Sequence, residues 1–219
     1  MGEIEPQSRF WVEAQVAVAK SAVFLAAAEA DVSRHDFSLG AVDAYYGLFH
    51  LSLALMWLLP ESLPVKLRES LASTRDAGSV LPNKLTSHKA AERFLCDGQV
   101  DLPVPKLGTL FREALELREF ASYGHRVSYD APGEPVVGPC SLTPNRVERV
   151  VRTAPPVFTE ALRAAWPRTA YDGALGQITA DGARRLLDDP QFPFKDWHSP
   201  AALGRARQLL GTLLGASSR

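Results

Sequence analysis

The sequence predicts an all-α fold, and three observations support that prediction. Apolar residues recur at the three- to four-residue spacing of amphipathic helices along almost the whole chain. No segment alternates polar and apolar residues with period two between turn signals, as a half-buried strand would. Hydrophobic residues make up 46% of the 219, which is enough for one compact core with or without an appendage.

Two long helices are predicted first. Residues 8–31 form an alanine-rich helix, with Ser8 as a candidate N-cap. Residues 41–59 form the most apolar helix, which ends before Pro60. A helix that is hydrophobic on nearly all sides is typical of the centre of a bundle. Because Asp43 interrupts this segment, we do not interpret it as a membrane span, and we expect no membrane attachment.

Three further helices are predicted in the middle of the chain. Residues 64–73 and 87–95 form short helices, the second with Ser87 as its candidate cap. Residues 106–123 form a longer amphipathic helix. Its apolar side, which we expect to face the core, comprises Leu107, Leu110, Phe111, Ala114, Leu117 and Ala121.

The last third of the chain begins with a segment rich in proline and glycine, residues 129–144, for which we expect no regular structure. Further helices are predicted at 144–153, 156–165, 179–188 and 200–214. Pro155 and Pro156 separate the first two, because proline inside a helix removes a hydrogen bond. We therefore expect residues 1–130 to form an up-and-down helical bundle, and residues 131–219 to form a loop and a helical C-terminal extension packed on it.

Composition favours a cytoplasmic protein without a cofactor. Cys96 and Cys140 lie far apart with no Cys-x-x-Cys pair, so the sequence indicates neither a zinc site nor a disulfide framework. There is no glycine-rich phosphate loop, serine nucleophile elbow or HExxH motif. The net charge is −1, and the sequence has no concentrated basic patch of the kind that usually binds nucleic acid.

One row of the helix at 106–123 carries polar residues on the apolar side. Phe111, Arg118 and His125 are spaced seven apart, which places them in one line if the helix continues to His125. Arginine is rarely buried without an anionic partner, because its charge cannot be lost by titration. Either Asp43 pairs with Arg118 inside the chain, a purely structural arrangement, or a phosphate meets Arg118 in a cleft.

The second alternative has a specific chemistry. A histidine with a pKa near neutrality can move protons to and from ribose oxygens during RNA cleavage, while a guanidinium stabilises the charge on the phosphoryl oxygens. Arg118 and His125 are therefore the candidate catalytic residues, and neither requires a metal. Ser122 and Tyr123 are candidates for hydrogen bonds to the same phosphate.

Two stretches resemble a known family. "AVDAYYGLFHLSLALMWL" resembles the Ala-Tyr-Tyr-x-x-Phe-His helix of HEPN domains, and "LREFASYGH" resembles their later Arg-x4–6-His motif. The resemblance covers residues 8–130 and implies a helical bundle, frequent dimerisation and, in many members, endoribonuclease activity. The family's catalytic pair matches Arg118 and His125 here.

The resulting hypothesis is a metal-independent endoribonuclease of HEPN type, acting on RNA as a homodimer or with a hetero-oligomeric partner. It would serve in a toxin–antitoxin, stress-response or antiviral defence system. The alternative is a non-catalytic HEPN-like module that binds a nucleotide, an RNA or a protein partner, and a third reading is a structural helical subunit of a larger assembly.

Other polar residues are interpreted as structural. His88 and Glu92 share a helix face at a spacing that can bind metal, but no further ligands are apparent, so we interpret them as surface residues. His50 is expected to pack in the core with one hydrogen bond. Arg146, Arg149 and Arg152 form a helical stripe that we interpret as a solvated face. The segment 192–200 is expected to be a loop packed on the bundle by its aromatic residues.

Overall fold

The computed structural model describes residues 7–59, 87–96, 104, 106–123, 127–131, 134–137, 142–166, 174–192 and 198–214. Within this part of the chain there are seven α-helices and one two-stranded hairpin, so the predicted all-α class is confirmed. The predicted helix at 64–73 lies outside the described residues.

The first two helices form a tight helical hairpin. Helix α1 spans Gln7–Ser33 and helix α2 spans Phe37–Leu58. His35 in the turn between them has a positive φ of 63°, and the Asp36 carboxylate accepts a hydrogen bond from the Leu39 amide at 3.1 Å. This N-cap starts α2 four residues before the predicted residue 41, because Asp36 satisfies an amide that would otherwise lack a partner. At the other end, α1 starts at Gln7, so Ser8 is a helical residue and not the predicted N-cap.

Helix α2 is the centre of the bundle, as its composition predicted. It packs against α1, α4, α5 and α6, and most of its residues are buried. Among the described helices, α2 alone has the length and hydropathy of a membrane span, and burial against its neighbours accounts for that composition. A close approach fixes the crossing with α1: Ser21 donates a hydrogen bond to the Gly47 carbonyl at 2.7 Å.

Helices α4 (His88–Cys96) and α5 (Leu107–Tyr123) cover one side of α2. Ser87 caps α4 as predicted, because its hydroxyl oxygen accepts a hydrogen bond from the Ala90 amide at 3.2 Å. The predicted apolar side of α5 faces the core, and Phe111, Ala114 and Leu117 are fully buried.

A hairpin follows α5, which the sequence analysis did not predict. Strand β1 (Val127–Ala131) pairs antiparallel with β2 (Glu134–Val137), in a register that joins Val127 to Val137 and shifts between Ser128 and Ala131. Pro132 and Gly133, which suggested a loop, lie between the two strands in the sequence and outside the described residues. The strands are too short for an alternation of polar and apolar residues to be evident.

Helix α6 runs without a break across Pro144–Ala165, so the predicted division at Pro155 and Pro156 is wrong. The apolar stripe continues through the prolines, and it comprises Val147, Val150, Val151, Ala154, Val157, Phe158, Ala161, Leu162 and Ala165, all of them buried. Burying one uninterrupted face offsets the backbone hydrogen bonds that the prolines remove. The Pro155 carbonyl also accepts a hydrogen bond from the Thr159 hydroxyl at 3.1 Å.

Two more helices complete the fold. Helix α7 (Ala174–Asp188) starts earlier than its predicted residue 179, and α8 (Pro200–Leu214) has the predicted bounds. Both pack on α1, and α8 also contacts α6. Arg205 of α8 forms an ion pair with Glu29 of α1 at 2.8 Å.

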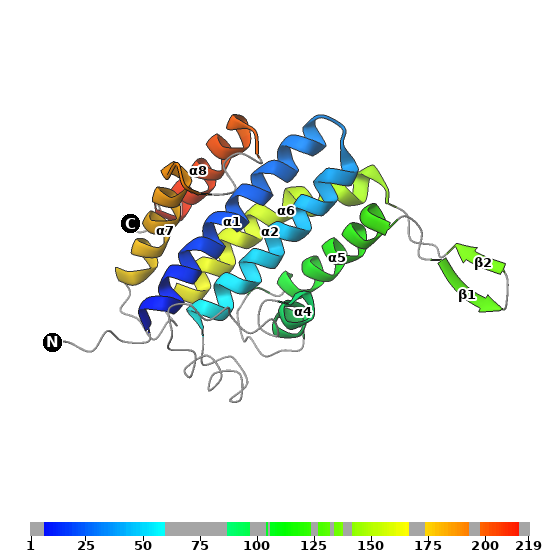
Figure 1. Cartoon of the computed structure of the whole chain (residues 1–219), viewed down its shortest axis with the longest axis horizontal. Helices are drawn as coiled ribbons and strands as arrows, with labels where there is room; N and C mark the ends of the chain where they lie inside the picture. Colours follow the sequence, from blue (N-terminus) through cyan, green and yellow to red (C-terminus); the bar gives the residue numbers. More distant parts are fainter. Residues whose placement is uncertain are drawn as a thin grey trace.

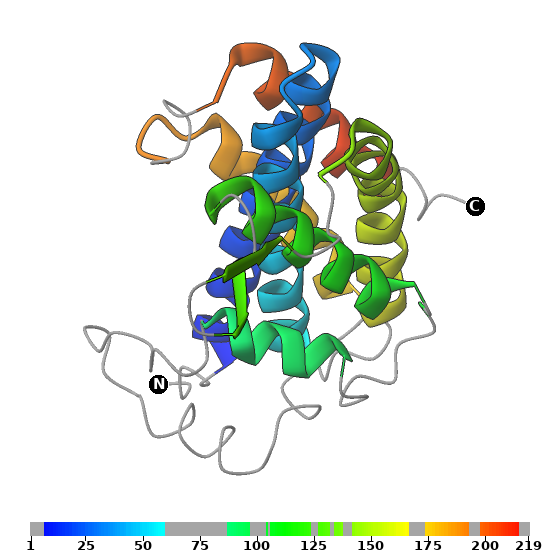
Figure 2. The same ribbon diagram turned by 90° about the vertical axis from the view of Figure 1, so that its right-hand side faces the viewer.

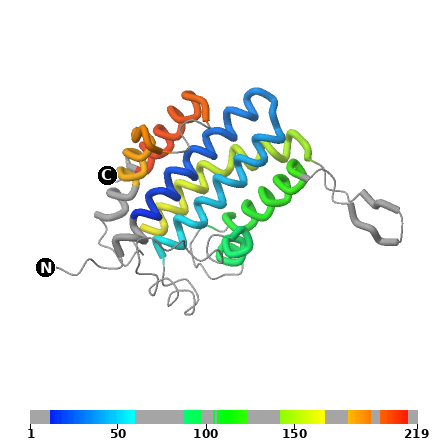
Figure 3. The backbone as a smooth tube through the Cα atoms, in the orientation of Figure 1, coloured from blue at the N-terminus to red at the C-terminus, as the bar shows by residue number. Residues whose placement is uncertain are grey.

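The long helices run in alternating directions. Figure 1 shows α1, α2 and α6 side by side, with α5 next to α2 on one flank and with α7 and α8 on the other. Figure 2 shows α4 and α5 together on the face that is turned towards the viewer. The backbone trace in Figure 3 shows α1 and α5 running one way and α2 and α6 the other, in up-and-down order. The division at residue 130 stays a prediction.

Candidate functional site

Arg118 lies where α5 meets α2. Its guanidinium carbon is 5.6 Å from the centre of the Tyr45 ring, and Tyr45 is fully buried. Phe111, about two helical turns earlier in the same row of α5, also contacts that ring, with the two ring centres 5.6 Å apart. The seven-residue spacing of Phe111 and Arg118 therefore directs both side chains at the same residue of α2. A guanidinium over an aromatic face is held by the electrons of the ring.

His88, the first residue of α4, completes this group. Its Nδ1 shares a hydrogen bond with the Tyr45 hydroxyl, and its ring lies against Phe49, with the ring centres 4.6 Å apart. The residue as a whole is exposed. We call Tyr45, His88 and Arg118 the junction site, because they come from α2, α4 and α5 respectively.

A series of ring contacts leads away from the junction site across α2 and α1. Phe49 contacts His50 at 5.3 Å between ring centres, and His50 stacks on Phe24 at 5.4 Å. Phe24 in turn meets the edge of His198 at 5.1 Å. Aromatic contacts of this length are favourable in both stacked and edge-on geometry. The rings of three histidines thus pack as aromatic surfaces between helices.

Burial and nearby cations lower the pKa of His88 and of His50. The pKa of His88 is lowered, first by burial and then by the Arg118 charge. The pKa of His50 is lowered to about 3 by burial, with smaller effects from Lys20 and His88. Burial also raises the pKa of Tyr45, and Arg118 is the strongest charge that opposes this rise. At neutral pH the junction site therefore holds a neutral imidazole, a protonated phenol and one guanidinium.

Carboxylates also act on the junction site. Glu92 on α4 and Glu119 on α5 each raise the pKa of Tyr45, and both effects are smaller than that of Arg118. Glu119 directly follows Arg118 in the sequence, and both side chains are half-buried. The guanidinium thus remains the dominant charge next to Tyr45.

The other predicted site residues lie at or beyond the end of α5. Ser122 is exposed and lies one helical turn from Arg118, on the same side of the helix. Tyr123 is the last residue of α5, and its side chain is not among those described. His125 lies outside the described residues, so its place beside Arg118 stays a prediction.

Asp43 is not the ion-pair partner of Arg118. Its pKa is raised to about 8 by burial, by a hydrogen bond with the Asp31 side chain and by the charges of Asp31 and Asp36. A guanidinium partner would lower the pKa instead. Asp31 itself pairs with Arg34, so this carboxyl pair belongs to the turn between α1 and α2. The predicted ion pair between Asp43 and Arg118 is therefore wrong.

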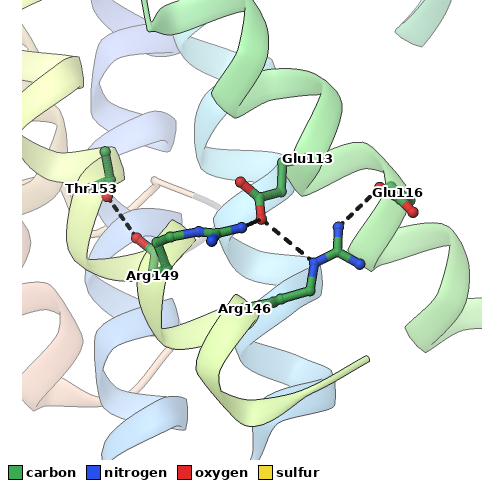
Figure 4. Close-up of polar contacts among 5 residues, drawn as sticks. All are labelled: Glu113, Glu116, Arg146, Arg149 and Thr153. Atoms are coloured by element: carbon green, nitrogen blue, oxygen red, sulfur yellow. Dashed lines mark hydrogen bonds and ion pairs between the residues drawn. The ribbon is translucent and has the colours of Figure 1, made fainter. Parts of the chain in front are cut away.

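The arginine stripe of α6 fastens α6 to α5. Arg146 donates a hydrogen bond to Glu116 at 3.0 Å, and its Nε lies 3.6 Å from Glu113, which also pairs with Arg149 (Figure 4). Arg152 is highly exposed and, among the described residues, pairs only with Glu148, at 4.0 Å. The prediction of a solvated face thus holds for Arg152, whereas the other two arginines bind α5 carboxylates, and this favours structure over RNA binding.

Three further interpretations are compared with the geometry. His88 and Glu92 do lie on one face of α4, and among the described residues no group of three His, Cys, Asp or Glu side chains could hold a metal ion. His50 packs between Phe24 and Phe49 as expected, and within the described part of the chain its Nδ1 has no hydrogen-bond partner. Phe192 is buried, which fits its expected packing role.

Sequence reasoning missed the contact between Tyr45 and His88. The two residues are 43 positions apart and belong to different helices, so no local spacing connects them. The available signal was a polar tyrosine on the most apolar helix, because a buried hydroxyl needs a hydrogen-bond partner.

Comparisons of this chain with models of protein families, with curated proteins and with solved structures found no match. The likeness to the HEPN superfamily therefore stands on the two stretches of sequence that carry it.

Proposed function

We propose that the protein is a metal-independent endoribonuclease of HEPN type, with Arg118 and His125 as its catalytic pair. The observation that supports it is the place of Arg118: its guanidinium lies at a junction of three helices, beside an exposed imidazole and over a tyrosine ring. A cation and imidazole groups are what RNA cleavage without a metal requires, to neutralise the phosphate and to move protons.

In this proposal Arg118 binds the non-bridging oxygens of the scissile phosphate, and His125 transfers a proton to or from a ribose oxygen. Ser122, exposed one turn after Arg118, can donate a hydrogen bond to the same phosphate, and Tyr123 is proposed for a similar role. We further propose a cytoplasmic homodimer, or a complex with a hetero-oligomeric partner, in a toxin–antitoxin, stress or antiviral system.

The test is cleavage of a fluorogenic single-stranded RNA in EDTA. We expect wild type to cleave, and Arg118→Ala and His125→Ala each to reduce the rate by roughly 100-fold or more, because each removes a group that acts in the transition state. Arg152→Ala is the matched control, since this highly exposed arginine pairs with Glu148 of its own helix at 4.0 Å, and it should cleave like wild type. Equal activity in His125→Ala would show that the proposed mechanism is wrong.

The carboxylates near Tyr45 favour one alternative function. Because Glu92 and Glu119 weaken the attraction for a phosphate, a non-catalytic module that binds an RNA, a nucleotide or a protein partner is the second candidate. In that case wild type would not cleave RNA, while Arg118→Ala would still lose binding to its ligand.

A further inference from the structure

His88 of α4 holds one of its two ring nitrogens in a hydrogen bond between helices. Nδ1 shares a hydrogen bond with the buried Tyr45 hydroxyl, while the residue as a whole is exposed. The ring is packed on Phe49, and its plane lies at 27° to that of Tyr45. Since Nδ1 is bonded to Tyr45, Nε2 is the ring nitrogen that we assign to a ligand.

His88 is in the protonation state that can accept a proton. Its pKa is lowered by burial and by Arg118, so the imidazole is neutral at pH 7 and one nitrogen carries a lone pair. A phenol hydroxyl can both donate and accept a hydrogen bond. When Tyr45 accepts from Nδ1–H, the lone pair is on Nε2, and when His88 gains a second proton the same contact remains. Tyr45 therefore fixes the ring in both protonation states.

We propose that His88 is a further catalytic residue of the junction site, which takes the proton from the attacking 2′-hydroxyl of RNA, and that Tyr45 is its positioning residue. This inference rests on the proposed function. It adds His88 of α4 as a second catalytic imidazole, besides His125, which the resemblance to HEPN domains implies. Arg118 and His88 both contact Tyr45, so one phosphodiester can meet the guanidinium and the imidazole together.

The reaction balances without a further reactant. The 2′-O–H bond breaks, its proton passes to Nε2 of His88, and the 2′-oxygen forms a bond to phosphorus. The bond between phosphorus and the 5′-oxygen breaks, and that oxygen takes a proton from the protonated form of His125. The products are a 2′,3′-cyclic phosphate and a 5′-hydroxyl end. Arg118 neutralises the charge that collects on the non-bridging oxygens.

The groups that act on His88 set the expected pH dependence. Arg118 from α5 disfavours the imidazolium, and burial acts in the same direction. Tyr45 and Tyr46 of α2 contact the ring, the charges of His50 and His88 interact, and Glu92 lies one turn away on α4. Glu119 of α5 acts on the neighbouring Tyr45. The rate should therefore rise with pH through a midpoint below the ordinary histidine pKa of about 6.5.

The test measures kcat and KM for RNA cleavage in EDTA across this pH range. His88→Asn is the informative variant, because its amide can still reach the Tyr45 hydroxyl but has no group in the place of Nε2. We expect kcat to fall by roughly 100-fold or more and the acidic limb of the pH profile to disappear. Lys89→Gln, the exposed neighbour on α4, is the control and should behave as wild type.

Tyr45→Phe tests the positioning role. It keeps the ring next to Arg118 and removes only the hydroxyl, so kcat should fall several-fold while KM stays unchanged. If the hydroxyl had only a structural role, its removal would lower the unfolding temperature but would not reduce kcat at an unchanged KM.

A second measurement does not depend on turnover. The imidazole signals of wild type are titrated by NMR with and without 3′-UMP, and His88→Asn assigns the signal. The pKa of His88 should rise on binding, because a phosphate favours the imidazolium. An unchanged pKa at saturation would overturn the inference.

The outcomes separate the two proposals. If cleavage requires Arg118 and His125 but His88→Asn keeps the wild-type rate and pH profile, only the role of His88 is wrong. If wild type does not cleave RNA at all, the proposed function is wrong and the proton transfer to His88 is wrong with it.

Discussion

A pair of carboxyl groups near the turn between α1 and α2 should make the stability of the folded state depend on pH. Asp31 is buried, and its carboxyl group shares a hydrogen bond with Asp43, whose pKa is raised to about 8. Two carboxyl groups that are this close share one proton at neutral pH. Arg34 forms an ion pair with Asp31, so a guanidinium also lies against this carboxyl pair.

This pair makes the folded state less stable as the pH rises. Below about pH 4 Asp43 is protonated in both states, and above about pH 8 it is ionised in both. Between these values the unfolded chain binds fewer protons, so the free energy of unfolding falls with pH, by at most about 1.4 kcal/mol per unit. We expect the unfolding temperature of wild type to fall between about pH 6.5 and 8 by calorimetry, and that of Asp43→Asn to stay nearly constant.

The measurement belongs above pH 6.5 because His50 acts in the opposite direction. Its pKa is lowered to about 3 in the folded state, so the stability that it confers is present above its ordinary value of 6.5 and is lost as the pH falls towards 3. Asp188→Asn, which changes an exposed carboxylate, is the control and should keep the slope of wild type. A parallel slope in Asp43→Asn would contradict the assignment.

Among the helices, the crossing of α1 and α2 depends on one missing side chain. A Cβ at Gly47 would lie 2.5 Å from a Leu25 methyl group and 3.2 Å from the Leu25 amide nitrogen. The methyl group could move, but the backbone nitrogen could not without displacing α1. The hydrogen bond from Ser21 to the Gly47 carbonyl depends on the same approach.

Gly47→Ala should therefore destabilise the protein by about 1–3 kcal/mol, the usual cost of overpacking. Gly211→Ala on α8 is the matched control, because a Cβ there meets nothing within 4 Å. It should stabilise the fold by up to about 1 kcal/mol, since alanine favours a helix more than glycine does. Urea unfolding measures both, and a stabilised Gly47→Ala would mean that the helices separate more easily than the contacts imply.

The sequence predicted the helices well where apolar residues recur over several turns, on nearly all sides in α2 and on one side in α5. It failed where a local signal competes with a long-range one. Pro155 and Pro156 suggested a break, but the apolar face of α6 continues past them into the core. The hairpin after α5 has strands of only five and four residues, which is too short for a periodic pattern.

The candidate site was predictable only in part. Helix geometry placed Phe111 and Arg118 in one row, and the structure shows both against Tyr45. The contact with His88 joins helices that are distant in sequence, so only their packing reveals it. The partner of Asp43 was mistaken for the same reason, because the sequence does not show that the turn brings Asp31 close to it.

Across the molecule, the described helices of residues 144–214 share a core with those before them. Helix α6 packs against both α1 and α2, and α7 and α8 cover α1. A chain that ends at residue 130 would expose all of these surfaces to water. We expect this fragment to unfold without a cooperative thermal transition by circular dichroism, whereas the full chain should show one. A sharp transition in the fragment would instead support a separate domain at 1–130.

The contact of α1 with α8 has a consequence for biosynthesis. Helix α1 leaves the ribosome before the other described helices, and α8 leaves it after them, yet α8 packs on α1 and Arg205 pairs with Glu29. Until α8 emerges, the part of the alanine-rich surface of α1 that α8 covers lacks this contact. Translation must therefore deliver nearly the whole described sequence before this surface is covered, and chaperones that bind nascent apolar helices have that interval in which to act.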